Sequence, residues 1–137
     1  MKPLHYYFLG TGAWFLFYGI HTVSFAWIVT IVLNESATMV ALAQMGFLIP
    51  ATLLMLIGGS LADQLGGRKV AIIGHLMASL APLFLSVVVY LDYLTFGTVL
   101  AFAIIMGCAQ ALVTPARDGL LALVAEGQIQ QRVVQVS

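Results

Sequence analysis

Three polar side chains lie deep inside long apolar stretches of the chain, where they could do chemistry. His21 is the only ionisable residue in the middle of the first stretch, and Gln44 and Gln110 lie in the second and the fourth. Such side chains are costly in hydrocarbon and are functional candidates, because they could exchange a proton or hydrogen-bond a ligand. The alternative is a structural role, since polar side chains also hydrogen-bond neighbouring helices in lipid. Both uses stay open for all three residues.

The first apolar stretch also carries a stripe of aromatic residues around His21. At helical spacing its members are Trp14, Phe17, Tyr18, His21, Ser24 and Phe25. A row of rings with a polar centre suits a pathway for aromatic or amphipathic compounds. The same rings could instead pack against other helices or face lipid.

The other reactive residue types form no catalytic or metal-binding pattern. His75 lies two turns from Lys69, near the end of the third apolar stretch, where a structural role is favoured. Cys108 is the single cysteine and is expected to be a small buried side chain. No Asp or Glu lies inside an apolar stretch, so proton coupling would depend on His21 or on groups outside this chain. We therefore expect no enzyme activity, no metal and no cofactor, and five Lys and Arg residues give no basic stripe for nucleic acid.

Composition identifies the elements that must position these residues. The chain has 137 residues, of which 62% are hydrophobic and 7% charged, and its mean hydropathy is +1.08. These values predict an integral membrane protein. The expected spans are about 6–33, 39–61, 70–91 and 94–113, followed by a cytoplasmic segment over 114–137. Because lipid leaves backbone groups without water, every span is expected to be an α-helix, which gives an all-α polytopic protein whose fourth helix ends at Pro115.

The positions of the cations predict the topology. In a four-span arrangement all five lie on one side of the membrane, namely Lys2, Arg68, Lys69, Arg117 and Arg132. The positive-inside rule then places both termini in the cytoplasm, and in the inner membrane if the protein is bacterial.

The densest cluster of charge is the glycine-rich stretch 59–69, which is expected to form a short loop at the membrane surface between the second and third spans. Its key residues are Gly59, Leu61, Ala62, Asp63, Gly66, Arg68 and Lys69. This pattern resembles the signature loop between helices 2 and 3 of the major facilitator superfamily. Gln64 and Gly67 depart from it, because basic residues are common at both places in the family.

The resemblance extends to the segment Pro115-Ala116-Arg117, which is similar to the connection after helix 4 in exporter-like members. It implies a secondary transporter that moves a small molecule by alternating access, with this chain as helices 1 to 4 and the approach to helix 5 of an N-terminal bundle. It also implies a gate latch in which Asp63 caps a helix of the opposite bundle and Arg68 pairs with an acidic residue such as Asp118, beside Arg117. The alternative is that these residues are ordinary interface charges.

A second functional class stays open, namely a small or truncated four-helix membrane protein that binds or regulates a partner without transport. Four helices cannot enclose a pathway that two bundles normally surround. In a bilayer the chain would therefore need the missing second half of a transporter or further copies of itself. Small residues could allow the close helix contacts of such an assembly, and they are Gly10, Gly12, Gly19, Gly58 and Ala62.

Overall fold

The computed structural model describes residues 2–136, and the side chains of residues 5–123. Its elements are α1 (Lys2–Trp27), the π-helix η1 (Ile28–Val32), α2 (Ala37–Leu65), α3 (Gly67–Tyr90) and α4 (Phe96–Val136). No strand occurs among the described residues, and four helices are long and apolar enough to cross a membrane. The prediction of an all-α, four-span membrane protein is confirmed.

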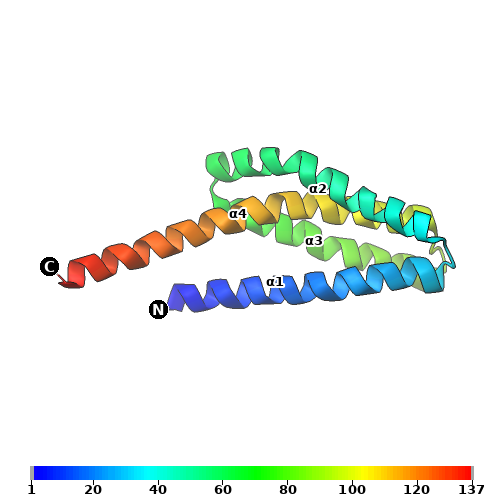
Figure 1. The fold of residues 1–137 in the computed structure, drawn as a ribbon, viewed down its shortest axis with the longest axis horizontal. Coiled ribbons are helices and arrows are strands. Elements are labelled where there is room, and N and C mark those ends of the chain that lie inside the picture. The colour runs from blue at the N-terminus through cyan, green and yellow to red at the C-terminus, as the bar shows by residue number, and fades with distance from the viewer. Residues whose placement is uncertain (1, 137) are drawn as a thin grey trace.

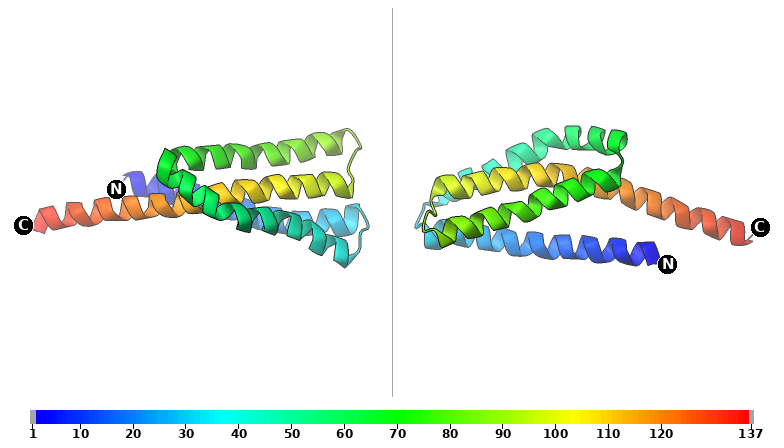
Figure 2. Two further views of the ribbon diagram at one scale, coloured as in Figure 1. Left: turned by 90° about the horizontal axis from the view of Figure 1, so that it is seen from above. Right: turned by 180° about the vertical axis from the view of Figure 1, so that it is seen from behind.

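The helices run alternately up and down as a bundle. Both termini and the α2–α3 connection lie at one end, and the other two connections lie at the opposite end (Figure 1). α4 packs extensively against α2 and α3, whereas α1 makes few contacts with α4 (Figure 2). The bundle is therefore a packed α2–α3–α4 unit with α1 attached along one side.

Short polar sequences fix the two connections at the far end. Ser36 precedes α2, and its hydroxyl accepts the backbone N–H of Met39 at 3.4 Å. Before α4 the arrangement is reciprocal: the Thr95 N–H donates to the Thr98 hydroxyl at 3.0 Å, and the Thr98 N–H donates to the Thr95 hydroxyl at 3.4 Å. These bonds satisfy amides that have no partner inside a helix, which is why both helices begin where they do.

The prediction of a loop over residues 59–69 is wrong in its extent. α2 continues to Leu65 and α3 begins at Gly67, which leaves Gly66 as the only residue between the two helices. Gly66 has a φ of 89°, a conformation that costs glycine little because it has no Cβ. One glycine is enough to reverse the chain, so the polar residues of the signature lie on helix ends.

The prediction that Pro115 ends the fourth helix is also wrong, because α4 continues through it to Val136. Proline lacks an N–H and therefore leaves the carbonyl of Ala111, four residues earlier, without its helical hydrogen bond. Gly58 of α2 lies directly against this carbonyl. The glycine Cα hydrogens can partly satisfy the freed oxygen, and neighbouring helices commonly compensate prolines in this way inside membranes.

Glycine also allows close backbone contact at two other places along α4. Gly107 lies against the carbonyl of Phe47 in α2, and Gly74 of α3 faces Val113. The largest fully buried side chains are Met106, Val29, Val70, Val99 and Val113. Apolar burial gives little driving force between helices in lipid, so close packing at small residues is what holds α4 between its neighbours.

Candidate functional site

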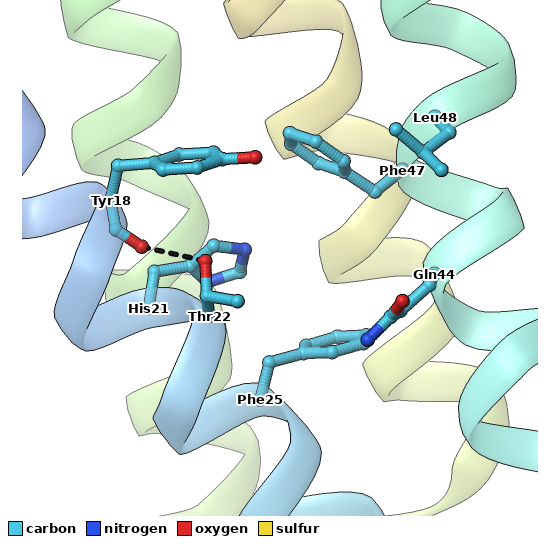
Figure 3. A pocket seen from close by; sticks show the side chains of 7 residues that line it. All are labelled: Tyr18, His21, Thr22, Phe25, Gln44, Phe47 and Leu48. Atoms are coloured by element: carbon cyan, nitrogen blue, oxygen red, sulfur yellow. Dashed lines mark hydrogen bonds between the residues drawn. The ribbon is translucent and has the colours of Figure 1, made fainter. Parts of the chain in front are cut away.

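A polar pocket opens between α1 and α2 at the level of His21. Its volume is about 100 Å³, and Figure 3 shows the side chains that line it, which are Tyr18, His21, Thr22, Phe25, Gln44, Phe47 and Leu48. The structure thus brings together four residues singled out in the sequence, namely Tyr18, His21, Phe25 and Gln44. We call this the His21 pocket.

Aromatic rings surround His21 on several sides. The distances from the centroid of the imidazole to the neighbouring ring centroids are 5.3 Å for Phe102, 5.6 Å for Phe25, 6.0 Å for Phe47, 6.2 Å for Phe17 and 6.3 Å for Tyr18. These rings come from α1, α2 and α4. Within residues 5–123 the imidazole makes no hydrogen bond to protein, so its nitrogens are available to water or a ligand.

The other polar groups of the pocket are partly committed to the helix. The hydroxyl of Thr22 donates to the carbonyl of Tyr18 at 2.8 Å, which fixes its orientation but leaves the oxygen free to accept. The amide of Gln44 reaches into the same space from α2, and the hydroxyl of Tyr18 points toward Phe47 (Figure 3). The pocket therefore offers an imidazole, an amide and two hydroxyls between aromatic walls.

Three other predicted pathway residues lie outside this pocket. Trp14 is buried and lines a larger groove of about 700 Å³ between α1 and α3, where its ring centroid is 5.0 Å from that of His75. Ser24 is exposed and does not line the pocket. Gln110 keeps a buried side-chain oxygen without a hydrogen-bond partner, as does Thr114 one turn further along α4.

The signature residues lie at the end of the bundle that carries the α2–α3 connection. Asp63, Arg68 and Lys69 are exposed, and Gly59 faces the ring of Pro115 across the α2–α4 contact. The sequence suggested that Arg68 pairs with Asp118, but the structure pairs Asp118 with its neighbour Arg117 at 3.5 Å. The reason is proximity, since adjacent side chains on α4 meet without bridging two helices.

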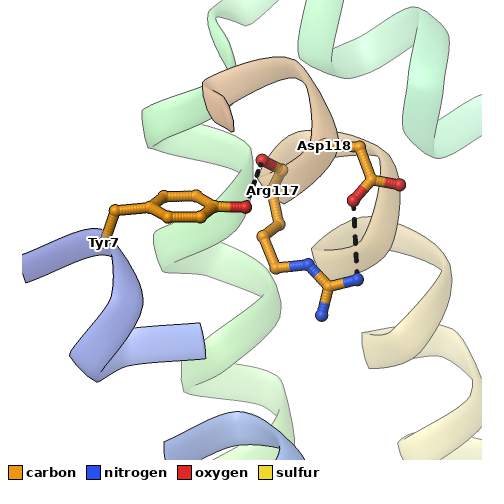
Figure 4. Close-up of polar contacts among 3 residues, drawn as sticks. All are labelled: Tyr7, Arg117 and Asp118. Atoms are coloured by element: carbon orange, nitrogen blue, oxygen red, sulfur yellow. Dashed lines mark hydrogen bonds and ion pairs between the residues drawn. The ribbon is translucent and has the colours of Figure 1, made fainter. Parts of the chain in front are cut away.

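Arg117 also attaches α1 to α4, a role that the sequence analysis missed. Its backbone carbonyl accepts a hydrogen bond of 3.3 Å from the hydroxyl of Tyr7 (Figure 4). Its guanidinium group lies 5.0 Å from the ring centroid of Phe15, within the range of a cation–π contact. A tyrosine near a span end is typical of the membrane interface, but nothing in the sequence indicates that it meets Arg117.

Within residues 5–123 no group of three His, Cys, Asp or Glu side chains could hold a metal ion. The residues that line the His21 pocket offer hydrogen bonds and aromatic contact. They lie on helices long and apolar enough to cross a membrane, which defines a polytopic membrane protein.

Comparison with known families gives the particular family. The family model described as transmembrane secretion effector matches residues 10–137, nearly the whole chain, and the chain belongs to this family of the major facilitator superfamily. Neither the curated proteins nor the solved structures give a match.

Proposed function

We propose that the chain supplies part of the substrate pathway of a transporter that exports a small aromatic or amphipathic molecule. The observation that carries this proposal is the His21 pocket, where an imidazole that makes no hydrogen bond within residues 5–123 lies among aromatic rings in the middle of a span. Family membership supports membrane transport, and the word secretion in the family description favours efflux.

The pocket suits recognition of a flat ring with a polar edge. The aromatic walls favour stacking, while the imidazole of His21 and the amide of Gln44 can each donate and accept a hydrogen bond. A ligand with a polar edge would gain these hydrogen bonds, which a purely apolar ring cannot make.

The size of the pocket indicates that this chain provides only one wall of the binding site. Pockets for small molecules usually measure about 300–1,000 Å³, whereas the His21 pocket measures about 100 Å³. It would hold one ring, and the rest of the ligand needs a second surface. We propose that the second half of a transporter or another copy of this chain provides that surface, with Asp63 at the end of α2 making a contact that breaks during gating.

The test is dye efflux from proteoliposomes that contain a transport-competent assembly of the chain, with ethidium and acriflavine as probes. His21→Phe keeps an aromatic ring but removes both nitrogens, and it should slow efflux about tenfold if one good hydrogen bond is lost. Ser24→Ala is the matched control, because Ser24 lies on the same helix but outside the pocket, and it should leave efflux unchanged. Equal efflux by the wild type and His21→Phe would contradict the proposed role of the pocket.

A partner-binding role is the second candidate, favoured by the small size of the pocket. It predicts dye or partner binding without flux. Equilibrium binding of the same dyes, measured beside efflux, separates the two functions.

A further inference from the structure

A further groove lies between α3 and α4, near the α2–α3 connection. It has a volume of about 420 Å³ and is lined by Arg68, Ala71, Ile72, His75, Leu76 and Leu120. α3 and α4 are in close contact beside the groove, because Gly67 at the start of α3 packs against the backbone of Ala116 and the side chain of Leu120. We call this the Arg68 groove.

The polar and apolar residues of the groove are arranged along its length. Arg68 is the second residue of α3 and marks the membrane surface, whereas His75 lies seven residues further along the helix, about 10 Å deeper at 1.5 Å per residue. The lining residues between them, Ala71 and Ile72, are apolar. The groove therefore begins with a cation at the interface and continues as a hydrocarbon surface into the bilayer.

Two cations, Arg68 and Lys69, lie at the mouth of the groove, and one carboxylate, Asp63, lies on the last turn of α2 before them. Within residues 5–123 neither Arg68 nor Lys69 forms an ion pair, and the first turn of α3 carries no acidic residue. The positive end of the helix dipole adds to the same field. An occupant of this groove must therefore be negative at the interface and apolar beyond it.

We infer that the Arg68 groove binds an anionic phospholipid, with its phosphate on Arg68 and the upper part of one acyl chain along Ile72, Leu76 and Leu120. Arginine suits this position because its guanidinium group can hold a phosphate through two hydrogen bonds. His75 lies at the deep end of the groove and also lines the larger groove beside Trp14. Its Nδ1 lies 2.7 Å from the carbonyl of Ala71, which ties the imidazole to its own helix.

Trp14 gives a fluorescent reporter next to the groove, because it contacts His75, which lines the groove. The chain contains only two tryptophans. Trp27→Phe leaves Trp14 as the single fluorophore. The protein is placed in bilayers of unlabelled phosphatidylcholine containing a small fraction of phosphatidylglycerol or phosphatidylcholine with brominated acyl chains, which quench tryptophan on contact. Brominated phosphatidylglycerol should quench Trp14 at several-fold lower mole fraction than brominated phosphatidylcholine.

Two neighbouring cations provide the matched variants. Arg68→Gln should raise the amount of phosphatidylglycerol needed for half-quenching about fivefold, the effect of one cation at a charged membrane surface. Lys69→Gln removes the same charge next to it but lies outside the groove lining, and should have a much smaller effect. Arg68→Lys should recover part of the preference.

Ala71→Leu tests the groove itself, because it fills the wall without changing charge and should also reduce quenching. Equal quenching by the two lipids, or equal effects of Arg68→Gln and Lys69→Gln, would overturn the inference in favour of general surface charge. Quenching of Trp14 by both brominated lipids that decreases as the protein density increases would also overturn the inference, because a second copy of the chain would then cover the groove.

Discussion

At the scale of single residues, Gly58 is the position where the bundle has least room. A Cβ there would overlap the carbonyl oxygen of Ala111, the same carbonyl that Pro115 leaves without its helical partner. Proline and glycine therefore act as a pair on facing helices: one frees a carbonyl, and the other lets a neighbouring backbone approach it.

This pairing predicts a sharp difference between adjacent glycines. Gly58→Ala should destabilise the bundle by about 1–3 kcal/mol, since the facing atoms are backbone and cannot rotate away. Gly59→Ala is the control, because its Cβ would meet only the ring of Pro115 at 3.9 Å, an ordinary contact. Unfolding in mixed detergent micelles measures both variants. Equal stability of the two would show that the α2–α4 contact is looser than described.

At the scale of elements, α1 differs from the other helices in how it is held. α4 packs closely against α2 and α3, but few contacts join α1 to α4. Those contacts are mainly aromatic or polar, and they include the Tyr7 hydroxyl on the Arg117 carbonyl and the ring of Phe15 beneath the Arg117 guanidinium group. α1 is therefore held mainly by side chains, including the buried rings of Trp14 and Phe25, rather than by close backbone packing.

Tyr7→Phe should loosen the end of α1, because it removes the hydroxyl that bonds to α4 at 3.3 Å and keeps the ring. A loss of about 0.5–1.5 kcal/mol is expected for one hydrogen bond. Amide hydrogen exchange in detergent should then increase in the first turns of α1 and stay unchanged in α3. Tyr6→Phe serves as the control, since Tyr6 is 73% exposed. If both variants exchanged alike, the Tyr7 bond would have no part in holding α1.

The elements were the part of the structure that sequence reasoning predicted best. Four apolar stretches of bilayer length and a one-sided distribution of cations are enough to give the number and alternation of the helices. The predicted helix ends near Gly66 and Pro115 were wrong, because glycine and proline were assumed to interrupt a helix whatever packs against it. At both places the packing between α2, α3 and α4 determines where the helix ends. Such contacts between helices cannot be predicted from the sequence of one segment.

The candidate site was predicted in part for the same reason. Tyr18 and His21 lie one turn apart on α1, so their shared face follows from helical spacing. That Gln44 joins them, while Trp14 turns toward His75, depends on how α1 rotates against α2 and α3. Tyr7 was missed because its partner is a backbone carbonyl, which carries no sequence signal.

At the scale of the whole molecule, Asp63, Arg68 and Lys69 flank the α2–α3 connection, at the end of the bundle where both termini lie (Figure 1). If this end forms the gate, Asp63→Asn in a transport-competent assembly should leave membrane insertion intact and reduce dye efflux. The expected cause is the loss of a charged contact to a helix N-terminus, worth about 0.3–2 kcal/mol.

Asp92→Asn is the matched control, because Asp92 lies in the turn at the opposite end of the bundle and tolerates asparagine at its φ of 56°. It should leave efflux unchanged. Insertion of all variants is checked by protease protection in the proteoliposomes. Normal efflux by Asp63→Asn would remove the gate hypothesis while leaving the His21 pocket untouched.

The single-residue connection at Gly66 has a mechanical consequence. Because the connection is one residue long, the adjoining ends of α2 and α3 must move together when α2 rotates or tilts. The packing of α4 against both helices keeps them from separating. The three helices would then move as one rigid body. Relative motion within this chain would then occur between α1, which carries His21, and the α2–α3–α4 unit. The His21 pocket lies between α1 and α2, so its shape would change with that motion.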